Sequence, residues 1–150
     1  SNTPALVGEG MTALCCETTF TPEELTFARG VFDALGKTVQ LPERMFDGVI
    51  AVSGSSPAYV YMLIEAMADA AVREGIPWKE ACRMAAQSVF GSALMVLTTG
   101  EHPAKLRDDV CSPGGTTIEA VTALERGNFR GVLLNAMEAC AEKSRAMGRS

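Results

Sequence analysis

Apolar side chains recur every three or four residues along most of this sequence, the spacing that gathers them on one face of a helix. The exceptions lie near its beginning. Residues 11–20 alternate loosely between apolar and polar side chains and residues 37–41 favour extended structure, so a strand is predicted at each. Between them, Thr21 as cap, Pro22 at the first helical position and Gly36 at the end predict a helix.

Beyond residue 42 the helical spacing continues, divided by prolines, glycines and capping residues. Helices are predicted over residues 43–52, 57–74, 77–99, 103–110, 116–126 and 129–146, with a break at residues 53–56. The fold class is therefore mainly α. A strand–helix–strand remnant over residues 1–42, too small to stand alone, is expected to be the edge of a larger α/β domain, and residues 43–150 form an all-helical domain.

One predicted helix has too few polar residues to face water. Between residues 81 and 99 the only charged side chain is that of Arg83, so this helix is apolar on nearly every face and must be surrounded by protein. The other helices of residues 43–150 are too few to enclose it. Alanines along the two long helices permit close approach of a second copy, so we predict an obligate, interlocked homodimer.

Composition narrows the class of protein. Hydrophobic residues make up 47% and charged residues 21% of the 150-residue chain, which is typical of a globular protein with a sizeable core. The formal net charge of −5, without a basic run, argues against nucleic acid as a partner. No uninterrupted apolar stretch reaches the roughly 18 residues of a membrane span, and no signal peptide is visible. A membrane is therefore not expected as a partner.

Cysteine and histidine usage argues against a disulfide framework and against a metal site. The five cysteines are odd in number and lack C-x-x-C spacing, which fits reduced thiols in a cytoplasmic protein. His102 is the only histidine and stands just before a predicted helix, so a surface or capping role is expected for it. We predict no metal ion.

The sharpest candidate for chemistry is the stretch at residues 109–119. Ser112 can cap a helix, Pro113 fixes the backbone where the chain turns, and Gly114 and Gly115 remove side chains from the helix entrance. Unpaired amide N–H groups at such an entrance are open to a small anion, such as a carboxylate. The alternative is a sharp loop into a helix, with the glycines present for turn geometry alone.

A second glycine run does not support the chemistry it first suggests. Residues 8–13 match the dinucleotide-binding pattern G-x-G-x-x-A. That function needs a strand before the pattern and a helix directly after it, whose first turn receives the pyrophosphate. Here a strand-like run follows, so we interpret residues 8–13 as a turn.

Three segments, in this order and at these separations, resemble the pyrroline-5-carboxylate reductase family. They are Ser-Gly-Ser-Ser-Pro-Ala-Tyr at residues 53–59, Gly-Glu-His-Pro at 100–103, and Asp-Val-Cys-Ser-Pro-Gly-Gly-Thr-Thr-Ile at 109–118. Asn-Thr-Pro at residues 2–4 is similar to the motif that the family carries near the end of its cofactor domain. The resemblance covers essentially the whole chain. It implies a Rossmann-type NAD(P)-binding domain followed by an all-helical domain that forms an interlocked dimer, with larger rings of dimers in the family.

By this resemblance, residues 1–42 are the C-terminal edge of the NAD(P)-binding domain and residues 43–150 are the dimerisation and substrate-binding domain. The implied reaction is hydride transfer from NADPH or NADH to the C=N bond of 1-pyrroline-5-carboxylate, which gives L-proline in the last step of proline biosynthesis. The chain alone is expected to bind NADP or NAD feebly and to be inactive. The alternative is a non-catalytic helical dimerisation module.

The resemblance also implies roles for single residues. Thr117 is the candidate catalytic residue, as the hydrogen-bond partner of the ring nitrogen. Substrate binding falls to Val110, Cys111, Ser112, Gly114, Gly115, Thr116 and Thr117. The residues implied to contact the cofactor are Asn2, Thr3, Pro4, Ser55, Pro57 and Asp109. Whether the helix start at residues 55–57 faces the nicotinamide or is a plain helix cap stays open.

Overall fold

The computed structural model describes residues 1–15, 17 and 19–149, so part of the strand predicted over residues 11–20 lies outside the described residues. The chain forms two compact units. One comprises Ser1–Val60 together with Leu134–Ser150, and the other comprises Tyr61–Leu133. The boundary predicted at residue 42 does not coincide with this division and stays a prediction.

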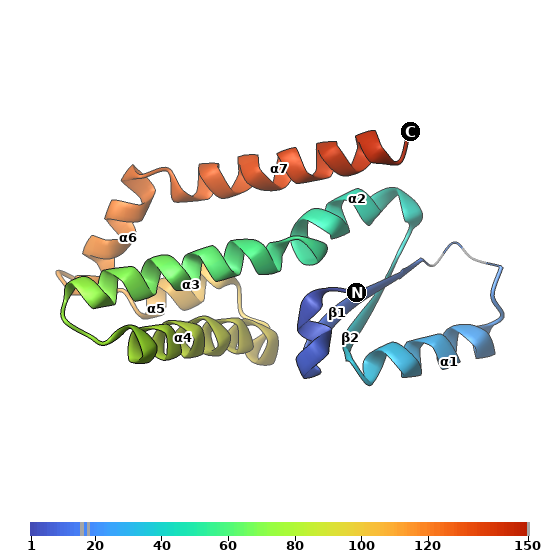
Figure 1. Ribbon diagram of the computed structural model, residues 1–150, viewed down its shortest axis with the longest axis horizontal. Helices are drawn as coiled ribbons and strands as arrows, with labels where there is room; N and C mark the ends of the chain where they lie inside the picture. Colours follow the sequence, from blue (N-terminus) through green and yellow to red (C-terminus); the bar gives the residue numbers. More distant parts are fainter. Residues whose placement is uncertain (16, 18, 150) are drawn as a thin grey trace. The chain divides into compact units, whose positions relative to one another are not determined.

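The first unit opens with a parallel strand–helix–strand arrangement (Figure 1). A 3-10 helix, η1 (Thr3–Val7), leads into strand β1 (Gly10–Cys15), which pairs in parallel with strand β2 (Gly36–Leu41). Helix α1 (Pro22–Asp33) connects the two strands and begins at the predicted cap. The Thr21 hydroxyl accepts the Glu24 N–H, and the Glu24 carboxylate accepts the Thr21 N–H, which completes a capping box.

Two glycines allow the strands to start against each other. Gly10 lies opposite Gly36 in the register, and a Cβ on Gly36 would stand 1.9 Å from the Gly10 carbonyl oxygen. Gly36 also has φ of 150°, which side chains disfavour. Gly8 ends η1 with φ of 79°, but residues 10–13 already belong to β1, so the prediction of a turn over residues 8–13 holds only at its start.

The helical part begins at residue 43 but is not broken where the sequence predicts. A 3-10 turn, η2 (Glu43–Met45), and helix α2 (Phe46–Val49) pass into a π-helical turn, η3 (Ile50–Gly54), and then into helix α3 (Ser56–Arg73). The predicted break at residues 53–56 is wrong. Ser55 donates its N–H to the Ile50 carbonyl at 2.8 Å, five residues back, so the helix widens here instead of ending.

The remaining helices follow the predicted boundaries closely. They are α4 (Trp78–Thr99), α5 (Pro103–Asp109), α6 (Thr116–Arg126) and α7 (Phe129–Met147). Gly100 ends α4 in the left-handed conformation with φ of 67°, and the His102 ring accepts the Ala104 N–H at 3.2 Å at the start of α5. The capping role predicted for His102 is thereby confirmed.

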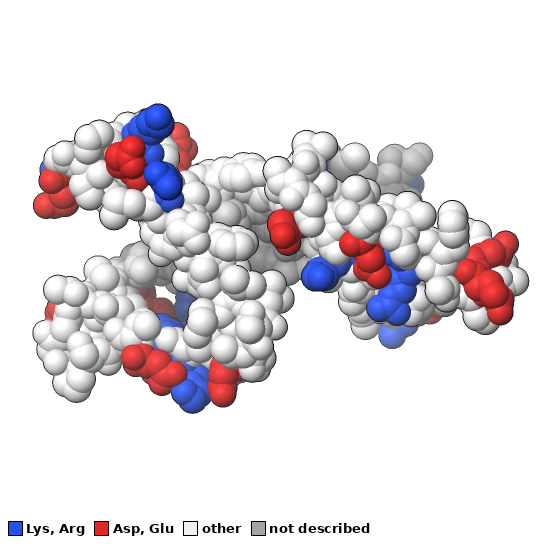
Figure 2. All heavy atoms as spheres, turned by 90° about the horizontal axis from the view of Figure 1, so that it is seen from below, with Lys and Arg blue, Asp and Glu red and all other residues white. Residues whose placement is uncertain are grey.

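The described part of the chain has almost no core of its own. Its buried hydrophobic residues are all alanines, Ala51, Ala68, Ala81 and Ala85, and no large side chain is fully buried. Large apolar side chains instead point outward on the long helices, with Leu97 81%, Met62 69% and Leu134 67% exposed. Figure 2 shows broad areas without charged side chains on the face that it presents.

Uncovered apolar helices can belong either to a membrane protein or to an assembly. The stretches Glu43–Arg73 and Trp78–Thr99 are long and apolar enough to cross a bilayer by length and composition. A second protein surface would cover the same apolar side chains. Because exposed apolar area costs about 25 cal/mol per Å², these faces require a cover of some kind.

The glycine contact between the strands generates a stability prediction. Gly36→Ala should lower the free energy of unfolding by about 2 kcal/mol or more, because the new methyl group collides with the Gly10 backbone. The matched control is Gly30→Ala in α1, where a Cβ meets nothing within 4 Å and helix propensity predicts a gain of about 0.5–1 kcal/mol. Urea denaturation at one protein concentration measures both, and equal midpoints for the two variants would contradict this account.

Candidate functional site

The stretch singled out in the sequence folds as a tight turn that enters α6. Gly115 donates its N–H to the Ser112 carbonyl at 3.0 Å, and Gly114 has φ of 67°. Proline at the second position and a glycine with positive φ at the third are the features of a type II turn. The turn sets Gly115 as the residue that precedes the first helical position of α6.

Gly114 is favoured because its φ is positive, but Gly115 is favoured for another reason. Its backbone is extended, with φ of −79°, so its conformation does not demand glycine. A Cβ there would stand 2.3 Å from Ser112 Oγ, however, so the missing side chain makes room for the Ser112 hydroxyl. The two glycines together therefore hold that hydroxyl beside the entrance of α6.

The structure changes the expected set of anion-binding donors. The prediction that the amide of Gly115 is open is wrong, because the turn itself uses that N–H. Ser112 is likewise not the residue at the cap position, which belongs to Gly115, and no side chain caps the helix there. The open donors at a helix start are the N–H groups of its first turn, which here begins with Thr116 and Thr117. The Ser112 hydroxyl lies beside this helix start.

Residues before the turn lie at the end of α5. Val110 is exposed, and Cys111 is half-buried with a free thiol. Asp109 pairs its carboxylate with the Lys105 ammonium group at 2.7 Å, one helical turn back. Both of these side chains are exposed, so the pair adds little to stability.

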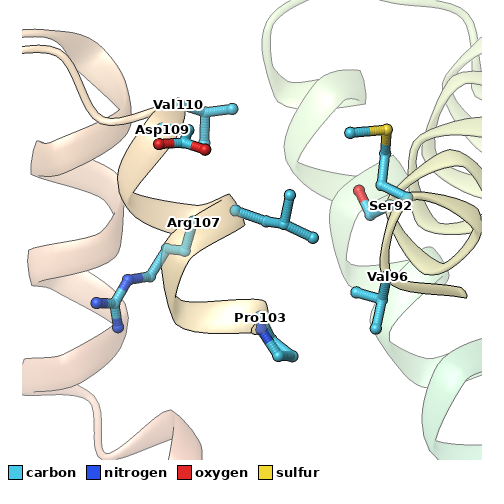
Figure 3. Close-up of a pocket in the computed structure, with 8 residues that line it drawn as sticks. Ser92, Val96, Pro103, Arg107, Asp109 and Val110 are labelled. Carbon is cyan, nitrogen blue, oxygen red and sulfur yellow. The ribbon is translucent and has the colours of Figure 1, made fainter. Parts of the chain in front are cut away.

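Asp109 and Val110 also border a mostly apolar cavity of about 450 Å³ between α4 and α5. Ser92 and Val96 face it from α4, and Pro103 lies at its α5 side, whereas the Arg107 side chain extends away from α4 (Figure 3). Ser112 and the residues of the α6 entrance do not line this cavity. It is therefore not the predicted carboxylate site, although two of the predicted residues lie on its border.

Apart from Asp109, the residues predicted on the cofactor side belong to the first unit. Thr3 and Pro4 begin η1, and Pro57 lies in the first turn of α3. Asn2 donates its side-chain amide to the Ser53 carbonyl at 3.2 Å and accepts the Met11 N–H at 2.9 Å. The structure thus joins Asn2 to the turn that precedes Ser55, whereas Asp109 and the α6 entrance belong to the other unit.

Contacts at Ser55 were not predictable from the sequence. The Cys140 thiol in α7 donates to the Ser55 hydroxyl at 3.2 Å, across 85 positions of the chain. Hydrogen bonding with Cys140, together with burial, raises the pKa of Tyr59. Ser55 and Cys140 border a second cavity of about 600 Å³, along with Asp47, Ile50, Lys143, Ser144, Met147 and Gly148.

Within the described residues no group of three His, Cys, Asp or Glu side chains could hold a metal ion. The site therefore offers hydroxyl groups and backbone amides instead of metal ligands. Hydroxyl and amide N–H groups can donate hydrogen bonds to an anion.

A parallel strand–helix–strand edge and long helices with uncovered apolar faces are typical of a helical assembly domain that follows the edge of an α/β fold. The family model described as pyrroline-5-carboxylate reductase dimerisation matches residues 43–147. The chain belongs to the pyrroline-5-carboxylate reductase family.

Relatives and solved structures agree with this assignment. The chain is 53% identical over 149 residues to the pyrroline-5-carboxylate reductase of Escherichia coli. The aligned region covers 99% of this chain and 55% of that protein. The enzyme of the same name from Arabidopsis thaliana is 47% identical over 149 residues, covering 99% and 54%. The crystal structure of Plasmodium falciparum pyrroline carboxylate reductase with NADP bound superposes with a TM-score of 0.90 at 35% identity, covering 98% of this chain and 60% of that one. The chain spans about half the length of the curated relatives that it matches.

The crowding at Gly115 generates a test of the turn. Gly115→Ala should displace the Ser112 hydroxyl and open the turn, so the amide of residue 115 should exchange with solvent at least tenfold faster, as measured by NMR hydrogen exchange. Gly127→Ala at the other end of α6 is the control, because a Cβ there makes only ordinary contacts at 3.4 Å or more. Unchanged exchange in the Gly115 variant would mean that the hydroxyl does not occupy this space.

Proposed function

We propose that this chain supplies the dimerisation and substrate-binding part of an NAD(P)H-dependent pyrroline-5-carboxylate reductase, which reduces the C=N bond of 1-pyrroline-5-carboxylate to give L-proline. The observation that carries the proposal is the 53% identity to a pyrroline-5-carboxylate reductase across 99% of the chain. It is supported by the family match over residues 43–147.

The carboxylate of the substrate is bound at the entrance of α6. The Ser112 hydroxyl, which the turn holds beside that entrance, donates to one oxygen, and the first-turn amides of Thr116 and Thr117 point along the helix axis toward it. The helix dipole adds about 0.3–1 kcal/mol of attraction for the negative charge. Gly114 and Gly115 bind no substrate atom with a side chain and act by shaping this turn. Val110 and Cys111 lie just before it and border the substrate.

Thr117 is the catalytic residue in this proposal. It is half-buried at the second position of α6, so its hydroxyl lies one step inside the entrance that binds the carboxylate. In 1-pyrroline-5-carboxylate the carboxylate is attached to the ring carbon that is bonded to the ring nitrogen. A hydroxyl next to the carboxylate site can therefore hydrogen-bond the nitrogen and hold the C=N carbon in a fixed place, which lowers the barrier through orientation.

A nicotinamide cofactor supplies the hydride when it is bound. The described residues do not form a pyrophosphate cradle, because residues 8–13 run into β1 instead of into a helix and the described sheet has only two strands. Contact with NADP or NAD is therefore confined to its nicotinamide end, through Thr3, Pro4, Ser55 and Pro57. The remainder of the cofactor needs a complete dinucleotide-binding domain.

The partner of this chain is a second copy of itself. The apolar faces of α3, α4 and α7 remain uncovered in one chain, and the matched family model is a dimerisation domain. Larger assemblies of such dimers fit the same proposal. A dimer also removes the need for a bilayer to cover these helices, so we propose neither a membrane nor nucleic acid as a partner. The free thiols of Cys15, Cys82, Cys111 and Cys140 support a cytoplasmic location.

A non-catalytic dimerisation module is the second candidate, and the engaged amide of Gly115 favours it by removing one expected donor. Binding of L-proline at the entrance of α6 separates the two candidates. An assembly module has no reason to bind a small carboxylate there, whereas the reductase must.

Thr117→Ala generates the test of catalysis. In a protein that joins this chain to a complete dinucleotide-binding domain, we expect kcat/KM for 1-pyrroline-5-carboxylate to fall at least tenfold, since one transition-state hydrogen bond is worth about 1.4 kcal/mol. Steady-state assays that follow NADPH oxidation measure this.

Thr122→Ala is the matched control on the same helix. Its hydroxyl donates to the Ile118 carbonyl at 2.8 Å and is therefore used within the helix, so we expect a change of less than threefold. Equal losses in the two variants, or an unchanged kcat/KM for Thr117→Ala, would remove Thr117 from the mechanism.

A further inference from the structure

In the π-helical turn η3, one backbone carbonyl lacks its regular helical donor. In a regular helix the Ser53 carbonyl would accept the N–H of residue 57, but that residue is Pro57 and has none. The next N–H, that of Ala58, donates to the Ser55 carbonyl at 3.1 Å. A half-buried carbonyl that loses its regular helical donor gains from a hydrogen bond to a side chain.

Asn2 supplies that donor from the start of the chain. Its Nδ2 lies 3.2 Å from the Ser53 carbonyl oxygen and 3.4 Å from the Ser53 hydroxyl. The Ser56 hydroxyl also points at this carbonyl, but at 3.5 Å it is the weaker donor. The shorter bond to the carbonyl therefore comes from a residue 51 positions away in the sequence.

The other end of the Asn2 side chain binds β1. Asn2 Oδ1 accepts the Met11 N–H at 2.9 Å. These two partners fix the orientation of the amide without ambiguity, because a backbone N–H can only donate and a carbonyl can only accept. The Asn2 carboxamide is thus used by the protein on both sides. It joins the first strand to the turn at which α3 begins.

We propose that Asn2 is a positioning residue that clamps β1 to η3 and thereby fixes the nicotinamide-facing segments Thr3–Pro4 and Ser55–Pro57 relative to each other. All of these residues belong to one compact unit. The role of Asn2 in catalysis rests on the proposed reductase function, whereas the clamp itself is a property of the chain. Asn2 acts through its neighbours, and its amide is not free to bind the cofactor as the resemblance implies.

The clamp is tested by hydrogen exchange on the chain itself. Asn2→Ala removes both bonds, so the Met11 amide should exchange at least tenfold faster. Asn2→Asp keeps an oxygen for Met11 and places a second oxygen against the Ser53 carbonyl, so Met11 should stay protected while the backbone resonances of residues 53–55 shift. Leu6→Ala, on an exposed residue of η1, is the control and should change neither. Unchanged Met11 exchange in Asn2→Ala would overturn the clamp.

The positioning role is tested by kinetics in a protein that joins the chain to a complete dinucleotide-binding domain. For Asn2→Asp we expect KM for NADPH to rise about fivefold to tenfold while kcat stays within twofold, because the segments on the cofactor side lose their fixed spacing. Leu6→Ala should match the unmodified protein. A KM for NADPH within twofold of that protein, or a loss confined to kcat, would overturn the positioning role.

The two proposals fail in different ways. An unmodified joined protein that folds but does not reduce 1-pyrroline-5-carboxylate would overturn the proposed function, and the positioning role in catalysis with it. The clamp would then be decided by the exchange of the Met11 amide alone. An active protein in which Asn2→Asp behaves like Leu6→Ala would overturn only the role of Asn2.

Discussion

Among the residues that the structure describes, the lack of a core of large side chains is the constraint on which the other features depend. The hydrophobic residues that a single chain buries are alanines, such as Ala68 in α3 and Ala85 in α4. Small residues allow helices to approach one another, but they bury little apolar area. Larger side chains, of which Leu97 is one, remain outward, and each leaves about 1.5–3 kcal/mol of hydrophobic free energy unused. Folding of the helical part and association of two copies are therefore expected to be one process.

Several polar groups and strand contacts depend on positions where glycine lacks a side chain or proline lacks an N–H. Gly115 leaves space for the Ser112 hydroxyl, and Gly36 allows β1 and β2 to start together. Pro57 has no N–H for the Ser53 carbonyl, which accepts the Asn2 amide. In each case a local feature of the backbone decides where a polar group ends up. Substitutions at these positions are expected to act on geometry before they act on chemistry.

The sequence predicted the features that depend on residues close to one another along the chain. The bounds of α6 follow from its glycine entrance and its periodicity, and the capping box of α1 follows from the spacing of Thr21 and Glu24. The π turn was missed because Ser-Gly-Ser-Ser has the composition of a loop, and only the packing of the chain shows that the helix continues. The bond between Cys140 and Ser55 joins positions 85 residues apart, so no local pattern could reveal it.

The dependence of unfolding on protein concentration tests the central claim, which is that a second copy covers the apolar helices. If association and folding are coupled, raising the chain concentration a hundredfold should stabilise the folded state by about 2.7 kcal/mol per association step and raise the denaturation midpoint. Urea denaturation followed by circular dichroism at about 1 and about 100 μM measures this. A midpoint that does not move with concentration would show that one chain is stable alone and would contradict the account.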